Sequence, residues 1–395
     1  MAQAVGGRGG SGMNSTADDA VDVVVIGGGV VGLAAAGTLA EAGRSVALLE
    51  RHPAFGREIS SRNSEVVHAG LYYPAGSLKA RHCVEGARRL YAFCRAAGVR
   101  HENCGKLVVA ADDVEAAELE RLKRAGETNG VSGLALIDGA ELARREPAAA
   151  GRLALVVPST GILNAHGLVD ALAVRAEAAG ALLVRGAGVF ALEPGEGGRP
   201  WRIGYRDGAG EDELFARVVV NAAGLGAQAV MRMAGMDPDA AGLRRWPCRG
   251  VYFSVAGRWR GALRGLVYPV PPANLTGLGI HSVKSLDGGF KLGPDTEYVD
   301  RDDDFTVDPG RRNAFYEAAR RYLPDLREDE LSPDMAGIRP KLSGPGEAAR
   351  DFYMAHEAAR GLPGFVNLAG LESPALTACL SLADGVRDLA AECLD

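Results

Sequence analysis

The stretch from Val21 to Glu50, VDVVVIGGGVVGLAAAGTLAEAGRSVALLE, carries the signal that decides the fold. It opens with a short β-branched apolar run, which is typical of a strand buried on both faces of a parallel sheet. Three glycines follow at once, then a run of good helix formers that stops at Gly43, and a second apolar run that ends on an acid. This order predicts a strand, helix and strand that together bind a dinucleotide.

The glycines have the G-x-G-x-x-G spacing and occupy positions 27, 29 and 32. Gly27 permits the tight turn, Gly29 lets the backbone approach a pyrophosphate, and Gly32 lets helix and strand pack closely. The pyrophosphate would lie at the helix N-terminus, where unpaired N–H groups favour negative charge. Glu50 ends the second strand, where its carboxylate can accept hydrogen bonds from a ribose. The motif alone leaves FAD and NAD open.

Composition narrows the classes of partner and location. The chain has 395 residues, enough for about two domains, and its 44 Lys and Arg against 50 Asp and Glu are dispersed, which disfavours nucleic acid. No apolar stretch approaches the roughly 20 residues that span a bilayer. Residues 1–20 lack a secretory signal and are predicted to be a disordered leader. The six cysteines have no C-x-x-C spacing, which predicts reduced thiols, no metal site and a cytoplasmic protein.

After Glu50 the chain enters an irregular segment rich in Gly, Pro and Ser, up to Ala80. A connection of this length inside a compact domain is uncommon unless it is functional, so it is predicted to run along an extended cofactor. It contains His68, preceded by two valines and followed by two tyrosines. We expect the valines to pack beneath the segment while the histidine and tyrosines face the reacting centre.

Four segments resemble one known family: SSRNSEVVHAGLYYPAGSLKA (60–80), VVVNAAGLGA (218–227), GIRPKLSGP (337–345) and NLAGLESPALTA (367–378). Together with the first glycine turn, they are similar to the FAD-dependent D-amino-acid oxidase superfamily, and within it to the L-2-hydroxyglutarate dehydrogenase/oxidase-like branch. The resemblance implies FAD as the cofactor. It also implies an α/β (α+β) fold of two domains, with a Rossmann-like FAD-binding domain of the glutathione-reductase-like type and a substrate domain on a mostly antiparallel sheet.

The two domains are predicted to be interleaved. Residues 21–80, 150–227 and 340–395 would form the FAD-binding domain, and residues 81–149 and 228–339 the substrate-binding domain. The residues expected to contact FAD are Gly27, Gly29, Val30, Val31, Gly32, Glu50, Arg51, Arg62, Asn63, Ser64, His68, Ala223, Gly224, Gly337, Arg339, Gly370, Glu372, Ser373, Pro374, Ala375, Leu376 and Thr377.

Oxidation of a 2-hydroxy acid by hydride transfer to flavin N5 needs a cation for the carboxylate, a base for the hydroxyl and a dry flavin face. Arg339 matches the G-[LIF]-R-P arginine that binds substrate carboxylate in this superfamily; the alternative is an arginine that clamps the domain junction. His68 is the candidate base, with a flavin-orienting histidine and a covalent flavin link as alternatives. The residues expected to complete a pocket for a second carboxylate are Lys291, His281, Tyr268 and Tyr73.

The sequence is compatible with several functions. The same scaffold could act on C–N bonds as an amino-acid or amine oxidase, and NAD-dependent dehydrogenases and dinucleotide sensors share the first motif. Asn164, Ala375 and Cys379 depart from the branch pattern, which leaves the exact substrate open. Oxygen or a quinone could accept the electrons, and peripheral contact with the inner face of the membrane is compatible with the sequence.

Overall fold

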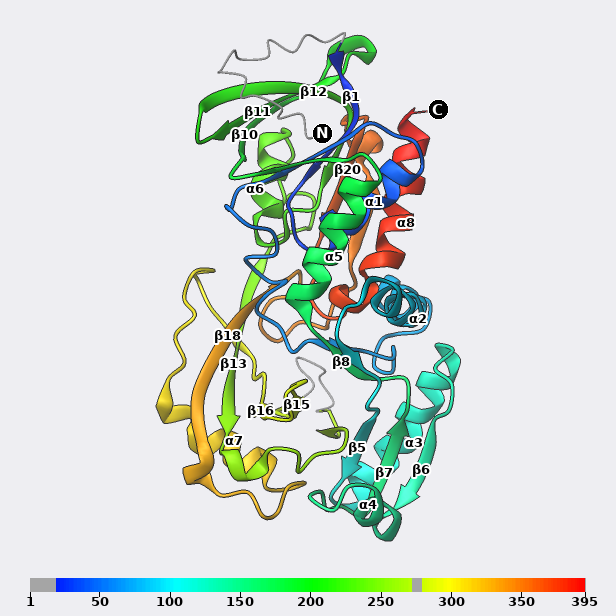
Figure 1. The fold of residues 1–395 in the computed structure, drawn as a ribbon, viewed down its shortest axis with the longest axis vertical. Coiled ribbons are helices and arrows are strands. Elements are labelled where there is room, and N and C mark those ends of the chain that lie inside the picture. The colour runs from blue at the N-terminus through cyan, green and yellow to red at the C-terminus, as the bar shows by residue number, and fades with distance from the viewer. Residues whose placement is uncertain (1–18, 272–278, 395) are drawn as a thin grey trace, which may run out of the picture.

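The computed structural model describes residues 19–271 and 279–394, so the predicted leader lies almost entirely outside the described part of the chain. Figure 1 shows β1, β12 and β20 with α1, α5 and α8 at one end of the molecule, and β13, β18, β5 and β7 at the other. We call these ends the upper and lower lobes.

The upper lobe is built on a sheet with the order β10-β11-β12-β1-β2-β9, extended by β20 and β19 beside β12. Its parallel strands are β1 (Val21–Ile26), β2 (Val46–Glu50), β9 (Leu182–Arg185), β12 (Gly210–Asn221) and β20 (Phe365–Ala369). The antiparallel additions are β10 (Gly188–Glu193), β11 (Trp201–Asp207) and β19 (Tyr353–His356).

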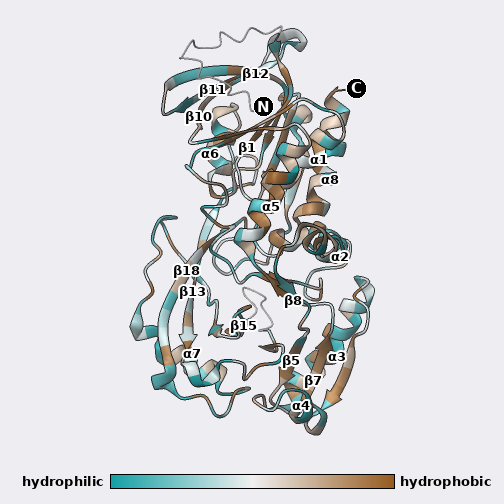
Figure 2. Cartoon of the chain, in the orientation of Figure 1, coloured by the Kyte–Doolittle hydropathy of each residue, from teal (hydrophilic) through white to brown (hydrophobic). Residues whose placement is uncertain are grey.

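Alternate residues of β1 belong to two different cores, as expected of a strand covered on both faces. Val23 and Val25 pack in the core that the sheet shares with four helices, whereas Val24 and Ile26 pack in the core with α6 and β11. The four helices are α1 (Val30–Glu41), α2 (Leu78–Ala97), α5 (Ala165–Ala178) and α8 (Ala375–Leu394), and α6 spans Ala227–Met233. Figure 2 shows the resulting concentration of apolar residues along α1, α5 and α8.

The lower lobe contains a larger antiparallel sheet and two smaller sheets. In the first, β13 (Trp246–Val255) pairs with β16 (Phe290–Leu292), β17 (Glu297–Tyr298) and β18 (Leu331–Lys341), and β15 (Ser282–Lys284) pairs with β16. The second has the order β14 (Leu266–Pro269), β5 (Lys106–Ala110), β7 (Leu153–Val157) and β6 (Ala135–Asp138), and the third β3 (Val66–Val67), β8 (Gly161–Leu163) and β4 (His101–Glu102). The helices here are α3 (Asp113–Thr128), α4 (Gly139–Arg145) and α7 (Arg312–Ala319).

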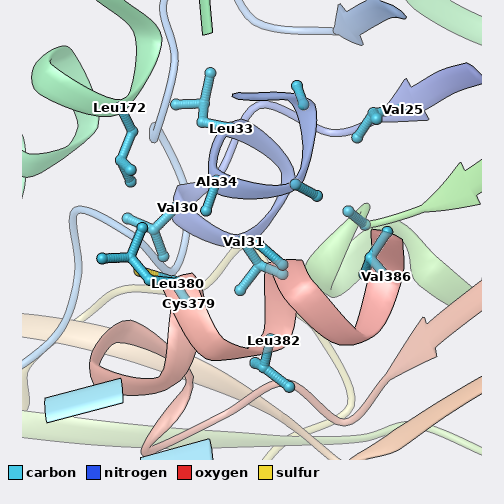
Figure 3. Close-up of a cluster of buried hydrophobic side chains, with 14 of the residues drawn as sticks. Val25, Val30, Val31, Leu33, Ala34, Leu172, Cys379, Leu380, Leu382 and Val386 are labelled. Atoms are coloured by element: carbon cyan, nitrogen blue, oxygen red, sulfur yellow. The ribbon is translucent and has the colours of Figure 1, made fainter. Parts of the chain in front are cut away.

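The predicted two-domain α/β fold with a mostly antiparallel second sheet is confirmed. The predicted domain limits stay a prediction, and several elements fall differently from them, among them α2 and β7. α2 packs with the upper lobe, because its buried Leu90 and Cys94 lie in the core that α1 and α8 share. Figure 3 shows that core where α1 and α8 pack together, with Val31 labelled on α1 and Leu382 on α8. β7 lies in the sheet of the lower lobe, where it pairs with β5.

The remaining global predictions concern membranes, metals and thiols. Within residues 19–271 and 279–394, no helix is long and apolar enough to cross a membrane. The same residues contain no group of His, Cys, Asp or Glu that could hold a metal ion. All six cysteines are free thiols, and four of them are buried.

Candidate functional site

A cavity of about 680 Å³ runs from the glycine turn of the upper lobe to the walls of the lower lobe. Gly27, Gly29 and Glu50 line one end, whereas Tyr252, His281 and Arg339 belong to strands and loops of the lower lobe. One continuous space therefore joins the predicted dinucleotide site to the predicted substrate residues.

The glycine turn has the close contacts that its sequence predicts. Gly27 has a φ of +110°, which favours glycine, and a Cβ atom on Gly32 would lie 1.9 Å from the carbonyl oxygen of Gly27. Gly32 thus permits the contact between α1 and the turn and does not line the cavity. The α1 N-terminus, with no side-chain cap on Gly29, opens onto the cavity.

Glu50 is buried at the carboxyl end of β2. Its carboxylate accepts hydrogen bonds from the backbone N–H groups of Gly28, at 2.7 Å, and His52, at 2.8 Å. These bonds fix the carboxylate at the edge of the cavity, where a ribose hydroxyl could reach its remaining lone pairs. Ser60 supports the same turn, because its Oγ accepts from the N–H of Val30 at 3.1 Å.

The other predicted cofactor residues gather along the cavity with two exceptions besides Gly32. Gly370 and Thr377 lie off it, although Thr377 Oγ1 accepts from the N–H of His68 at 3.0 Å and so positions that histidine. A Cβ atom on Gly337 would lie 2.2 Å from the carbonyl oxygen of Arg62, so this glycine permits β18 to approach the irregular segment. The predicted cofactor residues that line the cavity are Gly27, Gly29, Val30, Val31, Glu50, Arg51, Arg62, Asn63, Ser64, His68, Ala223, Gly224, Gly337, Arg339, Glu372, Ser373, Pro374, Ala375 and Leu376.

Arg339 lies on β18 and presents a guanidinium to the cavity. Its donors bond to three backbone carbonyls, those of Asp295 at 2.6 Å, Arg249 at 3.2 Å and Cys248 at 3.4 Å. Among the described residues, no carboxylate forms an ion pair with it. These bonds connect the guanidinium to β13 and to the loop after β16, which fits the role of a clamp at the domain junction. Because the acceptors are neutral carbonyls, the positive charge stays available to an anion, which fits carboxylate binding.

His68 follows β3 and lines the cavity. Its Nε2 lies 3.3 Å from Ser373 Oγ, and its buried Nδ1 has no hydrogen-bond partner in the described part of the chain. Burial, followed by the charges of Lys106 and His281, lowers the pKa of His68 to about 3. The imidazole is therefore neutral at physiological pH, and its unprotonated ring nitrogen carries a free lone pair.

Three of the four residues predicted for a second carboxylate lie at or beside the cavity. Tyr73 and His281 line it, and His281 stacks on Tyr268 with ring centroids 3.8 Å apart. Tyr268 is fully buried behind that stack, and its hydroxyl has no partner among the described residues. Burial lowers the pKa of His281 to about 3, so this imidazole is also neutral.

Lys291 does not lie with them. It sits on β16 between the buried Phe290 and Leu292, so the alternation of the strand turns its side chain away from that buried face. Its Nζ instead pairs with Asp334 at 3.2 Å, and both side chains are partly exposed. The structure therefore does not bring this predicted residue to the cavity.

The sequence did not single out Lys106, which begins β5 and is only 2% exposed. Its Nζ donates to Tyr72 Oη at 3.1 Å and lies 4.4 and 4.7 Å from the ring centroids of Tyr72 and Tyr268. No acidic partner occurs among the described residues. Burial lowers the pKa of Lys106 from 10.5 to about 7. The only signal in the sequence was a lysine opening the apolar strand GKLVVA.

A second group lies just before α8, where Glu372, a predicted cofactor residue, meets Lys79 and Lys341, which sequence reasoning missed. Glu372 forms buried ion pairs with Lys79 at 3.0 Å and Lys341 at 3.1 Å. Burial alone would raise the pKa of the Glu372 carboxyl, but the two lysines and Arg339 hold it at about 2. Tyr252, also missed, lines the cavity and shares a 2.8 Å hydrogen bond with Ser64 Oγ. These groups lend the cavity wall net positive charge.

A glycine turn of this kind, joined to a cavity with neutral imidazoles and an unpaired guanidinium, defines a dinucleotide-dependent oxidoreductase. The chain belongs to the FAD dependent oxidoreductase (DAO) family, whose sequence model matches residues 22–389. FAD is accordingly its cofactor, and the residues fit it: a turn too tight for a Cβ, an open helix N-terminus and a ribose-side carboxylate open on one cavity.

Relatives cover nearly the whole chain. The mitochondrial L-2-hydroxyglutarate dehydrogenase of Arabidopsis thaliana is 38% identical over 412 residues, which is 95% of this chain and 84% of the relative. The L-2-hydroxyglutarate dehydrogenase of Escherichia coli K12 is 30% identical, with 91% of each chain covered.

Solved structures of lower identity share the fold. L-α-glycerophosphate oxidase of Mycoplasma pneumoniae, determined with FAD bound, has a TM-score of 0.82 at 23% identity, covering 95% of this chain and 94% of that one. Glycine oxidase of Geobacillus kaustophilus has a TM-score of 0.77 at 21% identity, covering 94% and 95%.

Proposed function

We propose that this protein oxidises L-2-hydroxyglutarate to the corresponding 2-keto acid. Relatives of 30% and 38% identity that cover most of the chain carry that activity in their names. The observation that carries the proposal is Arg339, a half-buried cation without an acidic partner among the described residues, in the same cavity as the glycine turn and a neutral His68.

In this proposal Arg339 binds the carboxylate next to the reacting carbon. Its three bonds to backbone carbonyls hold the guanidinium plane in place before the substrate arrives, so little side-chain freedom is lost on binding. The buried surroundings strengthen the resulting ion pair.

His68 accepts the hydroxyl proton. Its neutral state keeps a lone pair available. The hydrogen bond from the backbone N–H of His68 to Thr377 Oγ1 fixes the backbone position from which the imidazole extends. FAD, when bound, accepts the hydride that leaves the α-carbon. The two lysines paired with Glu372 leave a net positive charge on the wall of the cavity, which favours the added negative charge.

Anaerobic bleaching of the flavin tests the proposal. The purified holoenzyme is mixed with L-2-hydroxyglutarate, its D enantiomer, L-malate, L-lactate, L-glutamate and glycine. We expect L-2-hydroxyglutarate to bleach the flavin fastest and to yield a keto acid without ammonia. Fastest bleaching by an amino acid, with ammonia released, would instead establish action on C–N bonds. Re-oxidation with air or a quinone analogue then identifies the electron acceptor.

Flavin attachment is tested on the same preparation. We expect acid precipitation to release the yellow colour, because His68 acts as the base in this proposal. Colour that stays with the precipitate would favour the covalent link and remove His68 from the role of base.

A further inference from the structure

We propose that Lys106, acting with Tyr72, recognises the second carboxylate of the substrate and makes the site selective for dicarboxylic 2-hydroxy acids. This inference rests on the proposed function and deepens it. It assigns to Lys106 the role that the sequence assigned to Lys291.

The surroundings of Lys106 are unusual for a structural lysine. Its ammonium carries three donors, of which one bonds to Tyr72 Oη, and within the described part of the chain it also lies over the ring faces of Tyr72 and Tyr268. Lysine is almost never fully buried without an ionic partner, because removing an ammonium from water is costly. No carboxylate in the described part of the chain compensates this charge, so an anionic ligand is the missing partner.

The position of Lys106 connects it to the substrate cavity. Tyr72 lines the cavity, accepts from the ammonium and keeps its own hydroxyl proton to donate to a carboxylate. Lys106 therefore acts on the ligand through that hydroxyl and supplies the charge behind it. Two more buried polar atoms in this region, Tyr268 Oη and His68 Nδ1, have no partner among the described residues.

His281 lies near both Lys106 and Arg339. The charges of both Lys106 and Arg339 act on its imidazole, so the ring lies within range of each cation. His281 itself lines the cavity and packs on Tyr268, whose ring faces Lys106. A ligand with a carboxylate at each end of a short carbon chain could thus meet Arg339 at one end and the Tyr72–Lys106 pair at the other.

The test compares two substrates that differ only at the distal end, L-2-hydroxyglutarate and L-2-hydroxypentanoate. Lys106→Met keeps the length of the side chain without its charge, and Tyr72→Phe removes only the hydroxyl. Lys123→Met is the matched control, because Lys123 pairs with Glu127 on the outer face of α3. We expect Lys106→Met to lower kcat/KM for the dicarboxylate by about 10- to 150-fold and for the monocarboxylate by less than about threefold. Tyr72→Phe should shift the ratio the same way by less.

Binding of unreactive analogues separates this inference from the proposed function. The holoenzyme is titrated with glutarate and with pentanoate while the flavin spectrum is followed. We expect glutarate to bind more tightly to the wild type, and Lys106→Met to remove that preference. If the wild type prefers glutarate and Lys106→Met does not, while neither hydroxy acid bleaches the flavin, then Lys106 selects dicarboxylates but the proposed oxidation is wrong.

The inference is overturned if Lys106→Met leaves the substrate ratio and the glutarate preference unchanged, or if both substrates lose activity equally. It is also overturned if Lys291→Met, rather than Lys106→Met, lowers the ratio. Lys106→Gln, assayed beside it, keeps a polar group at the site and gives a second reading should the methionine variant fold poorly.

Discussion

Lys106→Met should make the protein more stable at neutral and acidic pH, although it removes a hydrogen bond. At about 1.4 kcal/mol per pH unit, a lysine whose pKa falls from 10.5 to about 7 on folding costs about 5 kcal/mol while it is charged. The hydrogen bond to Tyr72, which methionine cannot make, offsets up to about 2 kcal/mol of this. We therefore expect the variant to be more stable by about 3 kcal/mol at pH 6.5.

The sign of the pH dependence follows from linkage. Because the folded-state pKa lies below the unfolded one, the unfolded chain holds the proton above pH 7 while the folded chain releases it. Wild-type stability thus rises by about 1.4 kcal/mol per pH unit relative to the variant, whose advantage should vanish near pH 9. The groups facing the ammonium do not titrate in this interval: the pKa values of His68 and His281 are lowered to about 3, and those of Tyr72, Tyr268 and Cys83 are raised above their ordinary values.

Urea unfolding of both FAD-saturated proteins from pH 6.5 to 9, followed by tryptophan fluorescence, measures the difference. Lys123→Met, at a partly exposed ion pair, should stay within about 0.5 kcal/mol of wild type at each pH. A Lys106→Met variant less stable than wild type at pH 6.5, or one whose advantage does not change with pH, would refute the reasoning.

Three further predictions follow from other parts of the site. Arg339→Ala should retain flavin but lose about 10- to 150-fold in kcat/KM, because about 1.5 to 3 kcal/mol of charge-assisted hydrogen bonding disappears; near-normal turnover would restrict Arg339 to clamping β13. Gly32→Ala should cost about 3 kcal/mol and most of the bound flavin, since its Cβ would lie 1.9 Å from the Gly27 oxygen, whereas Gly257→Ala meets nothing within 4 Å and should unfold like wild type in the same thermal scans. Because the pKa of His68 is about 3, kcat/KM should show no acid limb near pH 6.5; a limb there that His68→Gln removes would contradict the burial of this imidazole.

The parts of the fold that local sequence determines were predictable. The βαβ unit depends on neighbours in the chain, and the structure has it where expected; α2 likewise begins and ends at local capping residues. Ser77 accepts from the N–H of Ala80 and Gly98 ends the helix in the left-handed conformation. The side on which that helix packs depends on its contact with α8, far along the chain, and was not predictable.

The candidate site shows the same difference between features that local sequence determines and features that depend on distant contacts. His68 and Arg339 stand in motifs whose spacing marks them, and both line the cavity. Lys291 and Lys106 each lie on a short strand, and each side chain points to one face of that strand. Which face is buried depends on how the strand pairs with its neighbours. A sequence shows two lysines at strand positions, while the buried environment that makes one of them chemically unusual arises from tyrosines contributed by other segments.

β18 carries Arg339 and Lys341 two residues apart, and therefore on the same face of the strand. Through Lys341 this face is tied to Glu372, just before α8, and through Arg339 to the backbone of β13. A single inserted residue in β18 would turn both cations away from the cavity together. Stepwise changes of substrate specificity are therefore hard to reach through this strand. Changes in substrate range are more accessible where β5 and β14 pair behind Tyr72, because residues there can be exchanged one at a time.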